Sequence, residues 1–354
     1  MSAASPRRRA ALATLGLALA ATALTLLVAE LAARLLAAAP ARPAPRTVDP
    51  EIAKLPVLSG VFELALPNVR GRQGDVLWRT NSAGFRGPEV SPWPAAGVFR
   101  IAVAGDSFAA GQGVPEEDAY AAQLERMLNG SGAAARFEVL NFGLGGLDIA
   151  LVLSRATQLG AKFHPHLYVY GLTLNDIFPP NHPAERLWAE QNRAMQAEQS
   201  RAASSPSYLL RAVLPRLVSL EQVLFASPDS YFGSLTRAYR DPVQFTRIEH
   251  GLDGFQQLER ETGACVHVLI HTDLANLRLV HPFEDAYARI ERAARERGLT
   301  VTPTLRAFRW RDAARLRIGA YDGHPNAEGH RILAEALYRG LRELPPSCGF
   351  PAIP

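Results

Sequence analysis

The sequence predicts an α/β fold in which helices cover both faces of a central parallel sheet, giving a three-layer α/β/α sandwich. From residue 99 onward, short apolar runs alternate with helical patterns, which is typical of parallel strands joined by crossover helices. Several runs are apolar almost throughout, as expected for strands covered on both faces. The run beginning at Phe99 ends in Gly105-Asp106-Ser107, which would place a serine hydroxyl at the carboxyl edge of the sheet, where α/β proteins bind ligands.

Strands and helices can be assigned along this part of the chain. The predicted strands are Phe99–Ala104, Phe137–Asn141, Leu167–Leu172, Val266–Thr272 and Leu299–Thr304. The predicted helices carry apolar stripes at a spacing of three or four residues. These stripes are Tyr120, Leu124 and Leu128; Ile149, Val152, Leu153, Ala156 and Leu159; and Leu333, Leu337 and Leu341 within Ala327–Arg342. A chain of 354 residues is long enough to bury the core that such a sandwich needs.

The N-terminus predicts one transmembrane helix ahead of the sandwich. A basic tail, residues 1–9, ends in three arginines and precedes an uncharged run from Ala10 to Ala29. Twenty residues of helix span about 30 Å, the thickness of the hydrocarbon layer. Since arginines stay on the cytoplasmic side, we expect a signal anchor over residues 10–36, with the rest of the chain on the extracytoplasmic, periplasmic side.

A cleaved signal peptide is the alternative, with cleavage at Ala37-Ala38-Ala39. The apolar run is longer than the usual h-region of about 7–15 residues. Its helical pattern also continues beyond Glu30. The anchor is therefore favoured, and a proline-rich linker over residues 37–50 would follow it.

We expect a lead-in segment (residues 51–97), a main domain (98–345) and a short tail (346–354). The lead-in segment contains Asn81–Gly87, which has turn chemistry and receives no catalytic role; a wall of the active-site cleft is the alternative. Residues 178–261 form an insertion far longer than an ordinary crossover. Its apolar stretch from Tyr208 to Val218 predicts a helical layer packed on the sheet. The alternatives are a cap over the site, or a membrane-facing surface to which Arg211 and Arg216 would be suited.

Charge and composition narrow the possible partners. The chain carries +4 at neutral pH, but residues 1–46 contribute +5 and the remainder −1. No basic patch therefore indicates nucleic-acid binding. The glycines of Gly143-Leu-Gly145-Gly146 lack dinucleotide-binding spacing, and no metal-ligand spacing stands out, so we expect no cofactor and no metal.

The two cysteines, Cys265 and Cys348, form neither a metal cluster nor a redox motif. Cys265 lies in an apolar run and Cys348 in the tail, so the favoured interpretation is a buried thiol and an unrelated tail thiol. A disulfide between them is the alternative if the domain lies outside the cytoplasm.

Four motifs follow one another along the chain: Gly105-Asp106-Ser107-Phe108, Asn141-Phe-Gly143-Leu-Gly145-Gly146, Asn175-Asp176 and Asp322-Gly-His324-Pro-Asn326. In this order they resemble the four blocks of the SGNH (GDSL-type) hydrolase family, and they span about residues 98–343. The resemblance implies an SGNH or flavodoxin-like sandwich. The Asn81–Gly87 turn is similar to a lead-in found before the serine block in membrane-anchored bacterial members.

The resemblance implies a serine nucleophile and its helpers. Ser107 would attack, and His324, in a loop before the last helix, would act as the base that takes its proton. The oxyanion hole would consist of the N–H groups of Ser107 and Gly146 and the side-chain amide of Asn175. Asp322 would orient the imidazole, although the family pattern places this Asp three residues before the His, where Tyr321 stands here. Some extracytoplasmic relatives resembling alginate O-acetylation proteins use this shorter spacing. The alternative is that Asp322 only stabilises the loop and does not orient the imidazole.

The remaining polar residues near the motifs receive no catalytic role. We expect Asp106 and Asp176 to serve as scaffolding for their loops, and His330 to lie on the surface. His164 and His166 flank Pro165 and are interpreted as loop residues rather than metal ligands.

The function expected from these features is an extracytoplasmic serine esterase that acts on a small-molecule, glycan or lipid ester. One alternative is an O-acyltransferase that passes an acetyl group to an envelope polysaccharide. The other is a non-catalytic binding protein that keeps the fold.

Overall fold

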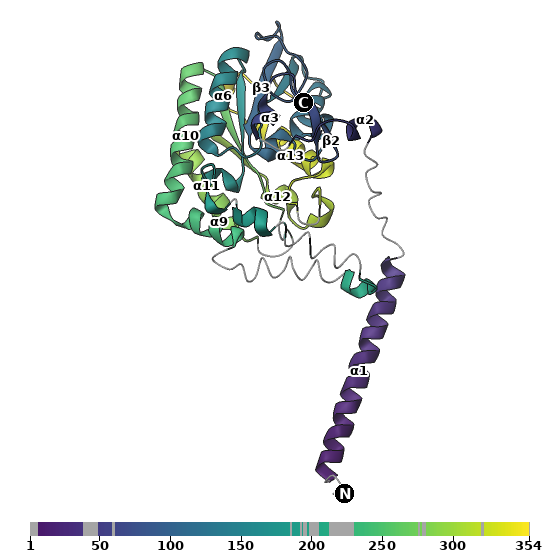
Figure 1. Ribbon diagram of the computed structural model, residues 1–354. Coiled ribbons are helices and arrows are strands. Elements are labelled where there is room, and N and C mark those ends of the chain that lie inside the picture. Colours follow the sequence, from purple (N-terminus) through teal and green to yellow (C-terminus); the bar gives the residue numbers. More distant parts are fainter. Residues whose placement is uncertain are drawn as a thin grey trace. The chain divides into compact units, whose positions relative to one another are not determined.

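The computed structural model describes residues 6–37, 49–58, 61–184, 186–191, 193, 197, 205–211, 230–274, 277, 281–319 and 322–353 (Figure 1). The chain forms two compact units. One comprises Met1–Thr47 and Arg193–Glu221, and the other comprises Val48–Asn192 and Gln222–Pro354. The second unit contains all four sequence motifs.

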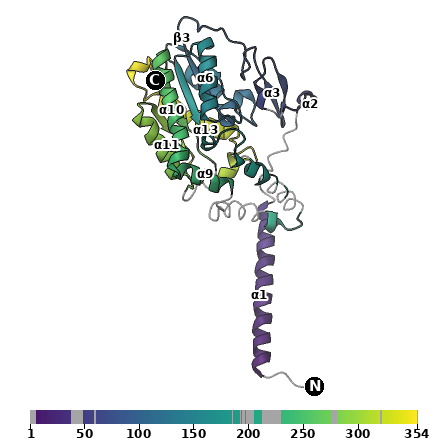
Figure 2. The same cartoon turned by 60° about the vertical axis from the view of Figure 1, so that its left-hand side comes forward.

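A five-stranded parallel sheet forms the centre of the second unit (Figure 2). Its strands are β3 (Val98–Gly105), β4 (Arg136–Asn141), β5 (Leu167–Leu172), β6 (Cys265–Ile270) and β7 (Thr300–Pro303), in the order β4-β3-β5-β6-β7. All neighbouring strands are parallel. The five predicted strands are confirmed, with ends that differ by at most two residues. Because β5 and β6 are buried at every position, their sequences are apolar nearly throughout.

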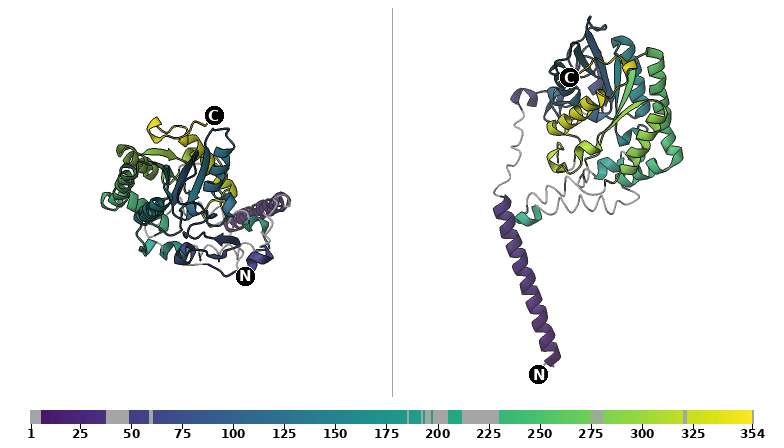
Figure 3. Two further views of the ribbon diagram at one scale, coloured as in Figure 1. Left: turned by 90° about the horizontal axis from the view of Figure 1, so that it is seen from above. Right: turned by 180° about the vertical axis from the view of Figure 1, so that it is seen from behind.

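Helices cover both faces of the sheet, as predicted (Figure 3). One core cluster joins the sheet to α6 (Ile149–Phe163), α9 (Tyr231–Arg240), α10 (Pro242–Thr262) and α11 (Glu284–Glu296). The other joins it to α5 (Tyr120–Asn129) and α13 (Ala327–Leu341). Alternate residues of β3 belong to opposite clusters, because successive side chains of a strand point to opposite faces.

Glycines allow two helices of the first layer to approach closely. A Cβ built on Gly251 of α10 would lie 2.3 Å from Ile149, and one on Gly254 would lie 2.2 Å from Leu153, both in α6. Ile149 is fully buried and meets the Gly251 position with three of its atoms, so this position needs glycine, whereas the end of the Leu153 side chain could move aside at Gly254.

One long N-terminal helix and several short elements complete the described chain. They are α1 (Pro6–Ala37), α2 (Pro50–Ala53), α3 (Val61–Ala65), α4 (Ser107–Ala110), α12 (Leu305–Phe308), the antiparallel strands β1 (Arg70–Gln73) and β2 (Val76–Arg79), and the 3₁₀ turns η1 (Glu116–Asp118), η2 (Leu174–Ile177), η3 (Ala313–Arg315) and η4 (Pro346–Cys348). Within α1, Thr14–Leu35 is long and apolar enough to cross a membrane.

The lead-in segment packs on the same core as the sheet. Trp78 of β2 is buried, and its ring nitrogen donates to the Leu64 carbonyl at 3.1 Å. The Phe85 ring lies 5.2 Å from the rings of both Phe142 and Phe163. Through these contacts, residues 61–97 pack as part of the same folded unit as the sheet.

The second half of the insertion forms α9 and α10, which pack on the sheet. Most of the apolar stretch from Tyr208 to Val218, together with Arg216, lies outside the described residues, which end at Arg211 and resume at Ser230. The three interpretations of that stretch therefore stay predictions.

Cys265 and Cys348 form a disulfide, so the favoured interpretation of two unpaired thiols is wrong. The tail runs past the amino ends of the strands. Cys348 is bonded to Cys265 at the start of β6, and the Phe350 ring packs 5.3 Å from Phe99 of β3 and 5.7 Å from Phe137 of β4. These aromatic contacts hold η4 beside β6 and place the two cysteine Cα atoms 5.4 Å apart. The contacts join segments that are far apart in the sequence, which is why cysteine spacing alone did not predict them.

Candidate active site

Ser107 lies at the first position of a short helix that begins where β3 ends. A Cβ on Gly105 would lie 2.6 Å from the Gly171 carbonyl of β5, so the turn out of the strand requires glycine. Asp106 is the N-cap of α4, and its carboxylate accepts a hydrogen bond from the Phe108 N–H at 3.0 Å. Gly111 ends the helix in the left-handed conformation. The serine is thus held by local geometry at the carboxyl edge of the sheet.

Ser107, His324 and Asp322 form a continuous chain of hydrogen bonds. Ser107 Oγ lies 2.8 Å from His324 Nε2, and His324 Nδ1 lies 2.5 Å from Asp322 Oδ1. An ionised carboxylate only accepts, so Nδ1 carries the proton and Nε2 is free to accept from the serine hydroxyl. The shorter Asp-x-His spacing therefore brings the carboxylate to the imidazole; Tyr321 lies outside the described residues.

Asp322 and His324 shift each other's pKa. Burial disfavours the imidazolium, but the hydrogen bond and the charge of Asp322 outweigh it and raise the pKa of His324. Burial likewise acts to raise the pKa of Asp322, yet the hydrogen bond from His324 and its charge hold that pKa below its ordinary value. The carboxylate is consequently ionised and able to stabilise a protonated His324.

The start of α13 fixes the loop that carries His324. Asn326 is the N-cap, and its side chain accepts from the Gly329 N–H at 3.0 Å. The same side chain donates to the Arg315 carbonyl at 2.8 Å. The His324 carbonyl accepts from the Ile318 N–H at 3.0 Å. One asparagine therefore joins the histidine loop to both the helix and the preceding segment.

The predicted oxyanion-hole residues come from the loops that follow β3, β4 and β5. Asn175 in η2 donates to Asp106 Oδ2 at 3.0 Å, and the Ser107 hydroxyl lies 3.3 Å from that same oxygen. Gly146 is exposed and adopts a φ of 77°, a conformation that favours glycine. A Cβ on the neighbouring Gly145 would lie 3.4 Å from Ser107 Cβ, so this backbone passes close to the serine.

Asp106 belongs to a buried hydrogen-bond network that sequence reasoning described only in part. Thr173 donates to Asp106 Oδ1 at 2.8 Å, so the Thr173 hydroxyl accepts from His271 Nδ1 at 3.1 Å. Burial lowers the pKa of His271 to about 4, and the ring is neutral at pH 7. His271 directly follows β6 at the same edge as Ser107, a position that could have identified it.

Asp176 is a scaffold of the η2 turn, as expected. It is fully buried, accepts from the Tyr170 hydroxyl at 2.6 Å, and forms a capping box with Thr173. Burial and the nearby charge of Asp106 raise its pKa well above the ordinary value. Its contacts are made with the turn and not with Ser107.

His330 is buried, so its predicted surface position is wrong. Its Nδ1 accepts from the Tyr120 N–H at 3.3 Å, and burial lowers its pKa to about 3. Its spacing from Leu333 and Leu337 places it on the apolar face of α13, a signal that could have indicated burial.

No metal site was found among the described residues. No group of three His, Cys, Asp or Glu side chains there could hold a metal ion. His164 ends α6 with a φ of 46°, and His166 Nδ1 accepts from the Arg100 N–H at 2.9 Å. Both lie in the loop before β5, as predicted.

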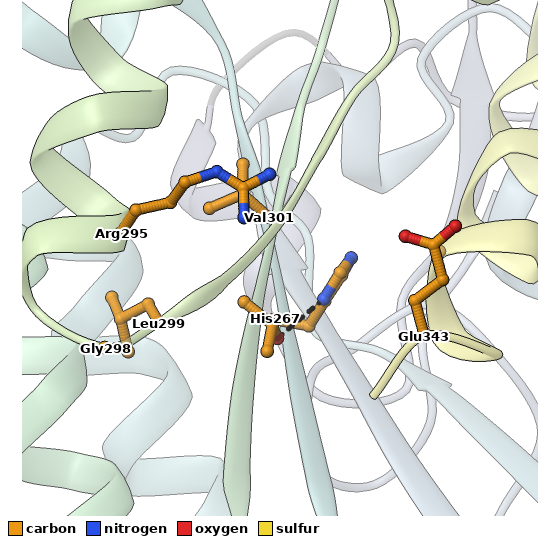
Figure 4. Close-up of a pocket in the computed structure, with 8 residues that line it drawn as sticks. His267, Arg295, Gly298, Leu299, Val301 and Glu343 are labelled. Carbon is orange, nitrogen blue, oxygen red and sulfur yellow. Dashed lines mark hydrogen bonds between the residues drawn. The ribbon is translucent and has the colours of Figure 1, made fainter. Parts of the chain in front are cut away.

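A cavity of about 220 Å³ lies elsewhere, along the edge strand β7 (Figure 4). It is lined by His267, Arg295, Thr300 and Glu343, among others, and by none of the residues described above as the site. His267 is held on both sides, because Thr300 and Thr302 lie 2.8 and 2.9 Å from its two ring nitrogens. The cavity thus lies apart from the four motifs, and its histidine is already bonded at both nitrogens.

The parallel sheet carries the hydrogen-bonded Ser107–His324 pair at its carboxyl edge, which defines the class of the fold as an α/β sandwich. The model of the GDSL-like Lipase/Acylhydrolase family matches residues 103–332, which include all four motifs. The chain belongs to this family and is an ester hydrolase. Among curated proteins, no sequence matches it.

Several solved structures are similar to the chain at low sequence identity. TesA is 18% identical with a TM-score of 0.41, over 69% of this chain and 98% of its own. The lipase Lip_vut3 from a goat rumen metagenome is 14% identical with a TM-score of 0.42, over 68% and 97%. Axe2, an acetylxylan esterase from Geobacillus stearothermophilus, is 14% identical with a TM-score of 0.41, over 68% and 93%. At these values the family assignment rests on the family model.

Proposed function

We propose that the protein is an extracytoplasmic serine esterase that works through a covalent acyl-enzyme. The continuous hydrogen-bond chain from Ser107 through His324 to Asp322 carries this proposal. Ser107 Oγ attacks the ester carbonyl while His324 Nε2 takes the hydroxyl proton. The new C–O bond gives a tetrahedral oxyanion, and Asp322 stabilises the imidazolium that forms.

The second half of the reaction uses the same groups in reverse. His324 returns its proton to the leaving alcohol as the ester C–O bond breaks, which leaves the acyl group on Ser107. Water then attacks, His324 takes its proton, and Ser107 is regenerated with release of the acid. The Ser107 and Gly146 N–H groups and the Asn175 amide stabilise the oxyanion in both halves. Asp106 supports this role because it accepts one hydrogen of Asn175 and leaves the other available.

Hydrolysis of para-nitrophenyl acetate tests the proposal. We expect steady turnover by the full chain, and no turnover and no fluorophosphonate labelling by Ser107→Ala. Wild-type activity retained in Ser107→Ala would exclude the mechanism. A burst of nitrophenol without turnover would instead indicate an acyltransferase that lacks its acceptor, and a lack of both burst and labelling would favour a binding protein.

We also propose that α1 is retained as a membrane anchor. Glu30 of α1 accepts hydrogen bonds from Ser207 Oγ at 2.7 Å and from the Tyr208 and Leu209 N–H groups at 3.0 and 2.9 Å. Arg34 pairs with Glu30 at 2.9 Å and lies over the Tyr208 ring. Cleavage at residues 37–39 would remove these partners. The disulfide supports an oxidising, extracytoplasmic compartment.

Mass spectrometry of the protein purified from membranes tests retention. We expect an intact N-terminus and resistance to extraction by alkaline carbonate. A mature N-terminus near residue 40, recovered from the soluble fraction, would show that the helix is a cleaved signal. Accessibility of an added cysteine to an impermeant thiol reagent in whole cells would then report the side on which the domain lies.

A further inference from the structure

The lead-in segment contributes a buried arginine that binds the end of α4, the short helix that begins with Ser107. Arg86 is 2% exposed, and its guanidinium donates to the carbonyls of Ala110 at 3.0 Å, Gly111 at 2.8 Å and Val114 at 2.7 Å. A fourth, longer contact of 3.5 Å reaches the Leu77 carbonyl. These acceptors are main-chain oxygens, and the first two belong to the end of α4 and its cap.

Arg86 also contacts the last residue of β4, directly before the glycine loop. Its backbone forms an antiparallel bridge with Asn141, whose side chain accepts from the Gly143 N–H at 3.0 Å. The Trp78 ring lies 4.7 Å from the guanidinium and covers its face. One residue of the lead-in segment therefore binds the end of α4 directly and is linked through Asn141 to the glycine loop of the predicted oxyanion hole.

Ser107 begins a helix of only four residues, so its position depends on how the other end of that helix is held. The last carbonyls lack partners within the helix and must find donors elsewhere. Arg86 supplies those donors from a rigid, planar group that binds several oxygens at once. Burial lowers the pKa of Arg86 to about 10, so the group is still a cation at neutral pH.

We propose that Arg86 is a positioning residue for ester hydrolysis: by binding the carbonyls at the end of α4 while pairing with Asn141, it holds Ser107 and the glycine loop in their reactive arrangement. This inference rests on the proposed serine-esterase mechanism. It assigns the Asn81–Gly87 turn a task in catalysis, where the sequence predicted none.

Arg100 provides a matched control, because it is another buried arginine that binds the lead-in segment. It pairs with Glu138 at 2.8 Å and donates to the Pro92 and Phe163 carbonyls at 2.8 and 2.6 Å. Arg100 lies near the amino end of β3, whereas Ser107 follows the carboxyl end. Its loss should destabilise the fold without moving the nucleophile.

The experiment compares Arg86→Met, Arg86→Lys and Arg100→Met in the full chain. We measure kcat and KM for para-nitrophenyl acetate, the rate of fluorophosphonate labelling, the number of titrated sites and the melting temperature. For Arg86→Met we expect kcat per titrated site and labelling rate to fall roughly 100-fold, because small displacements of reacting groups cost about that much. KM should stay within about twofold, and Arg100→Met should lose thermal stability with kcat within about twofold.

The lysine variant keeps the test decisive if Arg86→Met does not fold. An ammonium keeps the charge but cannot span the same set of carbonyls, so we expect a fall in kcat of about tenfold at a near-normal melting temperature. A kcat per titrated site equal to wild type in Arg86→Lys, or equal losses in Arg86→Met and Arg100→Met, would overturn the proposal. Failure of the esterase mechanism itself is distinguishable, because wild type would then neither turn over nor label.

Discussion

At the scale of single residues, Asp322 makes an unusually compact contact with His324. With one residue between them, Asp322 Oδ1 accepts both the main-chain N–H of His324 at 3.0 Å and the ring at 2.5 Å. The first bond fixes the carboxylate relative to the loop, and the second fixes the ring relative to the carboxylate. The shorter spacing is therefore compatible with an orienting role.

Replacing Asp322 by Asn should move the acid limb of kcat/KM to lower pH. His324 acts as a base only when neutral, and it is Asp322 that raises its pKa, while burial lowers it. In wild type the limb should lie above the ordinary histidine value of about 6.5. In Asp322→Asn only burial and weaker, more distant charges act on His324, so its pKa falls and the acid limb moves to lower pH. The value of kcat/KM on the plateau should also drop roughly 1,000-fold or more. Rates measured from pH 5 to 9 check both effects.

Asp312→Asn is the control for that profile. Asp312 caps η3 in the segment before the histidine loop, and its carboxylate accepts from the Ala314 N–H at 3.2 Å. We expect this variant to keep the wild-type pH profile. An acid limb that stays in place in Asp322→Asn would contradict the assignment of Asp322 as the group that sets the pKa of His324.

Residue type and motif order were enough to bring Ser107, His324 and Asn175 to one edge of the predicted sheet, because the carboxyl ends of parallel strands share that edge. The same argument reaches His271, which directly follows β6, but it predicts neither the bond between His271 and Thr173 nor the reach of Arg86. Each depends on which loops touch below the surface, and loop packing leaves no periodic signal in the sequence.

At the scale of elements, the strands were predictable because burial on both faces makes them apolar along their whole length. The tail was not predictable: η4 is three residues long and has no buried residues of its own. Its place depends on Phe350, which packs against two phenylalanines of β3 and β4. The disulfide then ties this tail to β6.

Removing the disulfide should lower the free energy of unfolding. Cys265 and Cys348 are 83 residues apart, and closing a loop of that size restricts the unfolded chain, which is typically worth about 2–4 kcal/mol. We expect Cys348→Ser to show this loss in urea unfolding. Dithiothreitol, which breaks the disulfide, should lower the stability of wild type to that of Cys348→Ser. It should leave the stability of the variant unchanged. Unfolding curves of wild type that coincide with and without dithiothreitol would show that the pair contributes nothing.

At the scale of the whole molecule, two apolar clusters lie on opposite faces of one sheet, and ionisable rings are buried among them. His267 lies on β6, His271 directly after it, and His330 on α13. Composition could predict the sandwich but not these burials, because they depend on which neighbours the fold brings to each ring. Threonine hydroxyls bond both ring nitrogens of His267. At His271 and His330 only Nδ1 is bonded, to the Thr173 hydroxyl and the Tyr120 N–H, and Nε2 is buried without a partner among the described residues.

These three histidines predict a loss of stability in mild acid. Burial lowers the pKa of His267 and His330 to about 3 and that of His271 to about 4, whereas the unfolded chain titrates near 6.5. Between these pKa values the unfolded state binds more protons than the folded state. The stability that the three neutral rings contribute is therefore fully present above about pH 6.5 and is lost as the pH falls. Each ring should cost about 2 kcal/mol between pH 7 and 5. Urea unfolding at pH 7 and pH 5 measures this loss of stability. In His330→Gln the loss should be smaller than in wild type by about 2 kcal/mol. An equal loss in the variant and in wild type would show that His330 is not held neutral by the fold.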